Sequence, residues 1–209
     1  MKTLVIGANG QIGRQFCALA AERNLPIRAM IRDRGQIPAF REIGVETVTA
    51  DLESDFRQAY EGCEQVIFTA GSGPHTGPDK TLLVDLHGAI RASDLADELG
   101  LARFTMVSAL RAEHPLQAPE RLRPYMAAKH AADGYLRRGR TPYVILKPGR
   151  LTDEPPSGRI TTDPDSVAHN HISRGNVARI LLAVAGNGGL RNAEYRILDG
   201  DMPIDTVFG

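Results

Sequence analysis

The 209-residue chain has little of what several specialised classes of protein require. Its two cysteines, Cys17 and Cys63, form neither a disulfide framework nor a metal motif, and so low a number suits a reducing compartment. Its 25 basic and 25 acidic residues cancel, so the chain has no general attraction to nucleic acid or to an anionic membrane surface. We therefore expect neither of these as a partner.

Long apolar segments are also absent. The longest, residues 180–185, is far shorter than the roughly 20 residues that cross a bilayer. Only four residues separate Lys2 from Gly7, which is too short for the apolar part of a signal peptide. The chain shows no internal repeat and no low-complexity segment. These absences predict a cytoplasmic protein with one domain over residues 1–209.

Short apolar runs alternate with amphipathic segments along the chain. We expect strands at residues 3–6, 26–31, 45–50, 65–70, 103–108, 143–146 and 195–198, and helices at 10–23, 82–99, 125–138 and 173–185. Gly100 should end the second of these helices, and Ser173 should cap the last. Apolar strands separated by helices are typical of an α/β fold whose parallel sheet is covered on both faces.

Three irregular segments interrupt this alternation, at residues 71–79, 110–124 and 150–170. Each follows the carboxyl end of a predicted strand, and ligands of open α/β sheets bind at that edge. We therefore expect these segments to shape a ligand site. The third lies in a small C-terminal cap expected within about residues 150–209.

The first predicted strand leads into the glycine loop GANGQIG. Gly7 would allow a tight turn, Gly10 the close approach of a pyrophosphate, and Gly13 the packing of the helix on the strand. The spacing alone is weak, because 21 glycines produce such a triplet by chance in about one chain in five. Its position between strand and helix favours a nucleotide site over a glycine-rich turn without ligand. The loop and helix start would bind the phosphates through Gly7, Asn9, Gly10, Gln11, Ile12 and Gly13.

The second predicted strand ends in Arg32-Asp33-Arg34. A site specific for NAD usually has an acidic residue here, about 20 residues after the glycines, on the ribose 2′-hydroxyl. Arg32 occupies that position, and with Arg34 it could bind a 2′-phosphate, which favours NADP(H) over NAD(H). Two alternatives stay open: a solvated basic turn, or Asp33 as the ribose ligand.

The ends of the third and fourth predicted strands complete the expected cofactor site. Asp51 and Leu52 follow the third strand, where they could contact the adenine. Ala70 and Gly71 end the fourth, and they are small residues where the cofactor would pass.

Tyr125 and Lys129 lie four residues apart, on one face of a predicted helix. An adjacent ammonium favours the phenolate, so Lys129 would lower the pKa of Tyr125 and could also hold the cofactor's ribose. Ser108 ends the fifth predicted strand, where its hydroxyl could bond a substrate carbonyl and the phenol. A tyrosine and a lysine at this spacing occur by chance in about one chain in ten. The alternative interpretation is that the two residues are neighbours on a surface helix, with no catalytic role. Their place at the ligand edge favours proton transfer.

Together these segments resemble the short-chain dehydrogenase/reductase superfamily, and more closely its atypical NAD(P)-binding branch. That branch is similar in plan to the extended epimerase/dehydratase enzymes but is much shorter. The resemblance covers nearly the whole chain: GANGQIG, IRDR, ADL, VDLHGAI, FTMVS, YMAAK and LKPGRLTD stand in family order. It implies a doubly wound, three-layer Rossmann sheet. It also implies that Ser108, Tyr125 and Lys129 are the catalytic set and that Pro148 and Gly149 border the nicotinamide.

The chain departs from the extended members in three respects. Asp85 occupies the position of an Asn that serves the family's proton relay. Lys147 replaces the Arg of an Arg-Pro-Gly motif. Only about 60 residues follow the sixth strand, too few for the substrate domain that a sugar-nucleotide enzyme needs.

We therefore expect an NADPH-dependent reductase that transfers hydride to a small carbonyl, quinone or flavin-like acceptor. The alternatives are an NADP(H)-sensing regulator without turnover and a small enzyme of epimerase/dehydratase type. Exposed apolar surface on the 80–99 helix would favour a partner or a homodimer. His169 and His171 lack Cys or acidic neighbours at suitable spacing in the sequence, so we expect no metal there.

Overall fold

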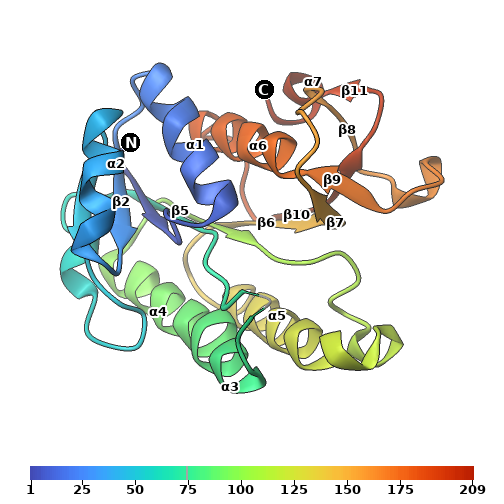
Figure 1. Cartoon of the computed structure of the whole chain (residues 1–209), viewed down its shortest axis with the longest axis horizontal. Helices are drawn as coiled ribbons and strands as arrows, with labels where there is room; N and C mark the ends of the chain where they lie inside the picture. The colour runs from blue at the N-terminus through green and yellow to red at the C-terminus, as the bar shows by residue number, and fades with distance from the viewer. Residues whose placement is uncertain (74) are drawn as a thin grey trace.

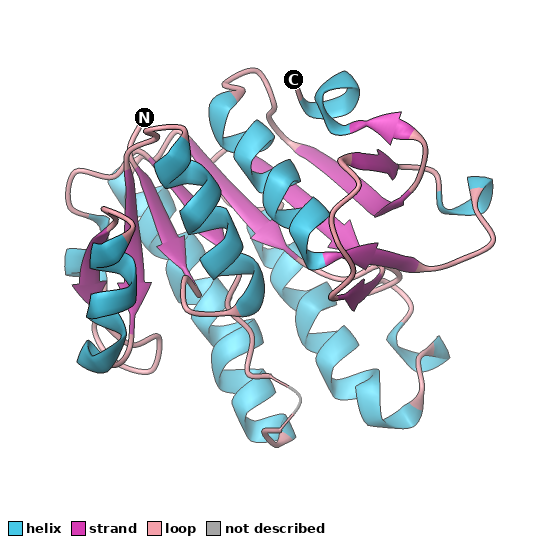
Figure 2. Ribbon diagram, turned by 45° about the horizontal axis from the view of Figure 1, so that its top comes forward, coloured by secondary structure: helices cyan, strands magenta, loops and turns pink. Residues whose placement is uncertain are grey.

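The computed structural model describes residues 1–73 and 75–209. Its main sheet has nine strands in the order β11-β8-β10-β6-β5-β4-β1-β2-β3 (Figures 1 and 2). These strands are β1 (Thr3–Ile6), β2 (Ile27–Ile31), β3 (Glu46–Thr49), β4 (Gln65–Phe68), β5 (Arg103–Val107), β6 (Tyr143–Pro148), β8 (Arg159–Thr161), β10 (Ala193–Asp199) and β11 (Met202–Pro203). A second, two-stranded sheet joins β7 (Arg150–Thr152) to β9 (His171–Ser173).

Helices cover both faces of the main sheet. They are α1 (Gln11–Glu22), α2 (Ile37–Glu42), α3 (Pro78–Lys80), α4 (Ala89–Leu99), α5 (Arg123–Leu136), α6 (Arg174–Gly186) and α7 (Ile204–Phe208). A π-helix, η3 (Thr81–Gly88), joins α3 to α4. The single 3-10 turns are η1 (Arg34–Gln36), η2 (Arg57–Tyr60), η4 (Pro115–Gln117), η5 (Glu120–Leu122) and η6 (Pro164–Ser166).

The apolar strands are buried because both of their faces are covered. Val5 lies in one core with Phe16 of α1 and Leu181 of α6. Leu4 and Ile6 point the other way, into the core that includes α4 and α5. Figure 1 shows the two helical layers, with α1 and α6 above the sheet and α4 and α5 below it. The prediction of a doubly wound α/β fold of Rossmann type is confirmed.

The C-terminal part extends the sheet further than its sequence suggests. The expected last strand, 195–198, is the seven-residue β10, which pairs in parallel with β6. The antiparallel strands β8 and β11 continue the sheet beyond it. Residues 150–170, expected to be irregular, hold β7 and β8. Strands of three residues are too short to show alternation in a sequence.

Two of the helix boundaries are as predicted. The Ser173 hydroxyl accepts a hydrogen bond from Asn176 N at 3.1 Å and caps α6. Gly100 ends α4 in a left-handed conformation, with φ +67°. The long helix expected from residue 82 begins earlier, at Pro78, and runs as a π-helix through residues 81–88. Leu82, Leu83 and Leu99 on it are exposed, and a homodimer through this helix stays a prediction.

An ion-pair network joins β6 and β10 to the end of α5. Glu194 accepts from Arg137 and lies 2.9 Å from Lys147 Nζ. Hydrogen bonds from Arg137 and from Lys147, together with their charges, lower the pKa of Glu194 to about 2, against the effect of burial. Lys147, in the place of the expected Arg, therefore has a structural partner.

Glu194→Gln should destabilise the fold by about 1–2 kcal/mol at neutral pH, because it removes the carboxylate that pairs with Arg137 and with Lys147, and leaves Lys147 only the longer contact with Glu113 at 3.6 Å. The folded-state pKa is depressed, so this stabilisation is present above the ordinary Glu pKa of about 4 and is lost as pH falls toward about 2. Urea unfolding at several pH values checks both parts. A penalty that is the same at about pH 3 and at pH 7 would contradict the ionic origin.

Candidate active site

The glycine loop brings the ends of β1 and β4 into direct contact. Gly7 has φ +88°, and a Cβ placed on it would overlap Ala70 N and lie 2.7 Å from both Ala70 Cα and Thr69 C. A Cβ on Gly13 would overlap Gly7 O and lie 2.8 Å from Ala8 Cα. Both positions therefore admit only glycine. The chain adds β2 and β3 on one side of β1 and then returns to add β4 on its other side. Nucleotides bind at such a switch point in doubly wound sheets.

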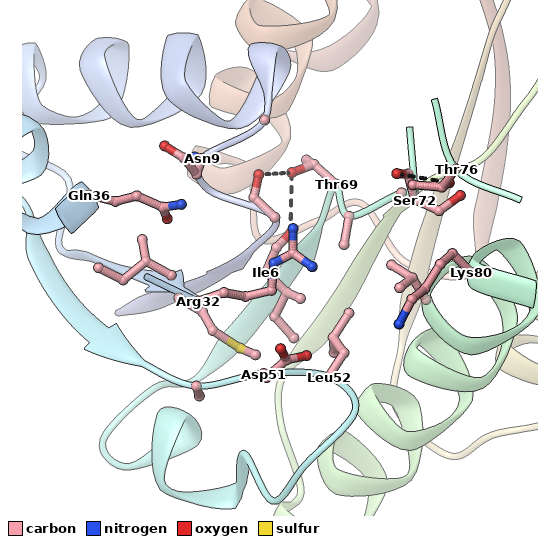
Figure 3. A pocket seen from close by; sticks show the side chains of 18 residues that line it. Ile6, Asn9, Arg32, Gln36, Asp51, Leu52, Thr69, Ser72, Thr76 and Lys80 are labelled. Atoms are coloured by element: carbon pink, nitrogen blue, oxygen red, sulfur yellow. Dashed lines mark hydrogen bonds between the residues drawn. The ribbon is translucent and has the colours of Figure 1, made fainter. Parts of the chain in front are cut away.

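A cleft of about 320 Å³ opens at this point (Figure 3). Most of the predicted cofactor residues that follow β1, β2, β3 and β4 line it: Gly7, Asn9, Gly10, Arg32, Asp51, Leu52, Ala70 and Gly71. Gln11, Ile12 and Gly13 lie in the first turn of α1 behind it and are not among its lining residues. The cleft has the size of a small-ligand site.

The N-terminus of α1 fits an anionic group. Its N-cap is Gly10, and no side chain caps the helix, so backbone N–H groups of the first turn are left for a ligand. Gly10 is exposed, and a Cβ there would meet only Gly7 O, at 3.3 Å. The Asn9 side chain is held beside the loop by Arg14, whose Nε donates to Asn9 Oδ1 at 2.9 Å. A pyrophosphate could approach this backbone closely.

The basic segment after β2 divides into residues with different environments. Arg32 lines the cleft, and in Figure 3 its side chain extends between Asp51 and the glycine loop. Asp33 instead accepts a hydrogen bond from Gly35 N at 2.8 Å and caps the turn η1. Arg34 begins that turn and is not among the lining residues. In the part of the chain that the structure describes, no carboxylate forms an ion pair with Arg32.

Several lining residues were not expected. Thr76 lies in the 71–79 segment, which was singled out only for its irregularity, Lys80 directly follows that segment, and Gln36 follows the basic turn. Thr69 and Ser72 flank the predicted Ala70-Gly71. Lys80 Nζ lies 2.6 Å from a carboxylate oxygen of Glu53. Only the position of these residues close after strand ends could have indicated that they line the cleft, because polar residues in loops follow no periodic pattern.

The predicted catalytic residues lie beyond this cleft, at the same edge of the sheet. Ser108 follows β5, and Tyr125 and Lys129 lie on α5. Ser108 Oγ donates its hydrogen bond to Asp133 Oδ2 at 2.7 Å. The hydroxyl proton thus points to Asp133, and the expected hydrogen bond from Ser108 to a substrate carbonyl stays a prediction. Asp133 was not predicted, although it lies four residues after Lys129 on the same helix face.

The electrostatics of the pair also differ from the expectation. Burial raises the pKa of Tyr125, and the charges of Asp85 and Asp133 raise it further. Burial lowers the pKa of Lys129, and the same two aspartates oppose that effect. The ammonium was expected to lower the phenol pKa. In the structure the charges of Asp85 and Asp133 act on both groups, and burial disfavours the charged form of each.

Pro148 and Gly149 lie where β6 ends. Gly149 N donates to Ile197 O at 3.2 Å, and Asn170 packs against the Gly149 Cα. The pair therefore fixes the start of the cap to β10. Whether it borders the nicotinamide stays a prediction, as do the catalytic and cofactor assignments as a whole.

His171 has acidic neighbours that its sequence context does not show. One ligand atom each of Glu154, His171 and Asp199 lie within 4.8 Å of one another. Asp199 is already engaged, because its two oxygens accept from Ser173 N and from Asn176 Nδ2. The fold thus brings acidic side chains to His171 that the spacing of the sequence does not show. The absence of a metal at this place stays a prediction.

Comparison with known proteins agrees with this geometry. The sequence model of a family described as NAD(P)H-binding matches residues 7–187. An uncharacterized sugar epimerase of Bacillus subtilis is 41% identical over 208 residues, which is 98% of this chain and 97% of that protein. A Bacillus halodurans structure named as an NAD-dependent epimerase/dehydratase has 38% identity and a TM-score of 0.95, covering 100% of this chain and 98% of that one. The oxidoreductase YlbE of Lactococcus lactis has a TM-score of 0.88 at 24% identity, covering 100% and 95%.

The fold and the glycine loop at its switch point define a dinucleotide-binding protein of Rossmann type, similar to the short-chain dehydrogenase/reductases. This chain belongs to the NAD(P)H-binding family. Among residues 1–73 and 75–209, no helix combines the length and the apolar character needed to cross a bilayer.

Proposed function

We propose that the protein is an NADPH-dependent reductase that transfers hydride to a small carbonyl, quinone or flavin-like acceptor. One observation carries this proposal: Tyr125 lies one helical turn from the buried Lys129 on α5, at the sheet edge that also holds the nucleotide cleft. A phenol and an ammonium in that position suit proton transfer to a reacting oxygen. Membership of the NAD(P)H-binding family supplies the redox partner.

Different residues would bind the cofactor and transfer the proton. The loop from Gly7 to Gly13 would hold the pyrophosphate, and Asp51 and Leu52 would lie against the adenosine. When bound, the reduced nicotinamide would supply the hydride that reduces the carbonyl, quinone or flavin-like acceptor. Tyr125 would donate its O–H proton to the acceptor oxygen or nitrogen that gains negative charge, and would regain a proton from water. Lys129, behind the phenol, would hold ribose hydroxyls and stabilise the transient phenolate.

The test is loss of NADPH absorbance in the presence of carbonyl, quinone and flavin acceptors, with NADH run in parallel. Turnover with at least one acceptor class, faster with NADPH than with NADH at low concentration, is the expected result. NADPH binding without oxidation of any acceptor would contradict the reductase and favour the NADP(H)-sensing alternative. Interconversion of a sugar substrate without net NADPH oxidation would instead favour the epimerase alternative, which the name of the Bacillus subtilis relative suggests.

Arg32→Ala should weaken NADPH binding by about 10- to 100-fold and NADH binding by less than about threefold. The guanidinium lines the cleft, and a charged hydrogen bond to a 2′-phosphate contributes about 1.5–3 kcal/mol. Arg34→Ala is the matched control, because Arg34 is not among the lining residues and should change both affinities little. Titration calorimetry with both dinucleotides measures the difference. Equal losses for NADPH and NADH in Arg32→Ala would contradict the 2′-phosphate assignment.

A further inference from the structure

Lys80 is held at the wall of the nucleotide cleft by a carboxylate that is not itself part of the cleft. Lys80 is among the lining residues and Glu53 is not. The Lys80 Nζ atom lies 2.6 and 2.8 Å from the two carboxylate oxygens of Glu53. An ammonium has three N–H donors, so at least one of them stays free for a ligand. The hydrogen bond to Glu53 raises the pKa of Lys80, which keeps this group a donor.

The turn after β3 holds Asp51 and Glu53 in a fixed relation. Glu53 N donates to Asp51 Oδ1 at 3.0 Å. The same turn is fastened to α4, because Arg91 Nη1 donates to Leu52 O at 2.7 Å. Asp51 also lines the cleft, and its Oδ2 accepts no hydrogen bond among the described residues. Asp51 therefore offers an acceptor oxygen to the same cleft in which Lys80 offers a donor.

The two side chains come from different walls of the cleft (Figure 3). Asp51 belongs to the turn after β3, whereas Lys80 ends α3 in the part of the chain that follows β4. Among the residues that the structure describes, the Lys80–Glu53 pair is the one hydrogen bond or ion pair that joins residues 71–80 to residues 50–56. The side chains of Lys80 and Glu53 are 43% and 32% exposed, and a pair so open to solvent contributes little to stability. Its position at the cleft indicates a role in binding instead.

The chemistry of this group matches one edge of adenine. That edge presents an amino group, which donates, next to the ring nitrogen N1, which accepts. An acceptor from Asp51 and a donor from Lys80 are complementary to these two atoms. Hypoxanthine has the reverse pattern, a carbonyl oxygen next to an N–H, and would bring acceptor against acceptor and donor against donor. Leu52 and Val84 also line the cleft, and they can supply apolar contacts for the faces of a flat ring.

We propose that Lys80 is a specificity-determining residue that donates to adenine N1 while Asp51 accepts from the adenine amino group, and that Glu53 is the positioning residue for Lys80. This inference rests on the dinucleotide binding of the proposed function and names the part of the ligand that this end of the cleft recognises. Glu53 already balances the charge of Lys80, so the group suits a neutral base better than a second phosphate. Arg32 stays the residue assigned to the 2′-phosphate.

The test compares NADPH with reduced nicotinamide hypoxanthine dinucleotide phosphate, in which a carbonyl oxygen replaces the amino group of the base. Titration calorimetry measures both dissociation constants and needs no acceptor. The parent should bind NADPH at least about 10-fold more tightly, because the analogue leaves both partners unpaired. Lys80→Met keeps the length of the side chain and removes its donor, so it should weaken NADPH binding by about 10-fold and binding of the analogue by less than about twofold. Glu53→Gln should lower the ratio of the two affinities in the same direction by a smaller factor.

Lys2→Met is the matched control. Lys2 also pairs with a carboxylate, that of Glu46, and is not among the residues that line the cleft. Its replacement should leave both dissociation constants unchanged. A change in loop packing alone would weaken both dinucleotides by the same factor and keep the parental ratio. A parent that binds the two dinucleotides equally, or a Lys80→Met variant with the parental ratio, would overturn the proposal.

NADH separates the base from the 2′-phosphate. It has the same adenine without the phosphate, so Lys80→Met should weaken NADH and NADPH by the same factor, whereas Arg32→Ala should affect mainly NADPH. A loss confined to NADPH in Lys80→Met would assign this lysine to the 2′-phosphate and overturn the assignment to the base.

The outcome is separable from that of the acceptor assay. A failed acceptor screen with the expected affinity ratios would remove the reductase and leave the recognition of adenine. Turnover of an acceptor with an unchanged ratio in Lys80→Met would leave the reductase and remove the role of Lys80.

Discussion

Tyr125→Phe should lower kcat for the accepted substrate by about 10²- to 10⁴-fold, the range that a positioned general acid contributes. The change removes one hydroxyl from a half-buried ring and leaves the ring's packing on α5 in place. Because the phenol lies outside the nucleotide cleft, NADPH affinity should change by less than about threefold. Steady-state kinetics and calorimetric NADPH titration of the same preparation measure the two quantities.

Tyr135→Phe is the matched control for this substitution. Tyr135 lies on the same helix, is exposed, and donates its hydroxyl to Asp94 at 2.6 Å. Its loss should leave kcat within about twofold, because an exposed hydrogen bond contributes little. If Tyr125→Phe keeps parental turnover, hydride transfer proceeds without the phenol, and solvent protonates the product.

The fold was predictable because its signals are local. Each buried strand is a short apolar run, and the glycines of the first loop stand at the spacing that the contact between β1 and β4 requires. The alternation of strands and helices then indicates a parallel sheet covered on both faces. For the same reason the residues after β1, β2, β3 and β4 were expected at one site, and the structure places most of them around one cleft.

The details of the proton-transfer group were less predictable because they depend on tertiary contacts. Ser108 and Asp133 are 25 residues apart, and nothing in either segment indicates that the hydroxyl donates to the carboxylate. The π-helix that places Asp85 opposite α5 has no periodic signature of its own. The sequence shows the spacing of Tyr125, Lys129 and Asp133. Their burial, which sets the direction of the pKa shifts, is visible only in the folded chain.

Gly7→Ala should reduce the free energy of unfolding by about 4 kcal/mol or more, which is exceptional for the addition of one methyl group. Two costs combine at this position. The left-handed backbone, with φ +88°, costs a residue with a Cβ about 1–2 kcal/mol. The new methyl would also overlap Ala70 N and lie 2.7 Å from Thr69 C, and backbone at the end of a buried strand cannot move away without breaking its own hydrogen bonds.

Gly62→Ala separates the two costs. Gly62 also has a positive φ, +69°, but a Cβ there would have no atom within 4 Å. It should therefore lose only the backbone part, about 1–2 kcal/mol. Urea unfolding followed by circular dichroism gives both values on one scale. The excess loss in Gly7→Ala measures how tightly β1 and β4 meet at the nucleotide cleft, and equal losses would mean that the two strand ends are farther apart than the structure places them.

Any folded Gly7→Ala protein should also bind NADPH more weakly, because the displaced loop no longer presents its amides to the pyrophosphate.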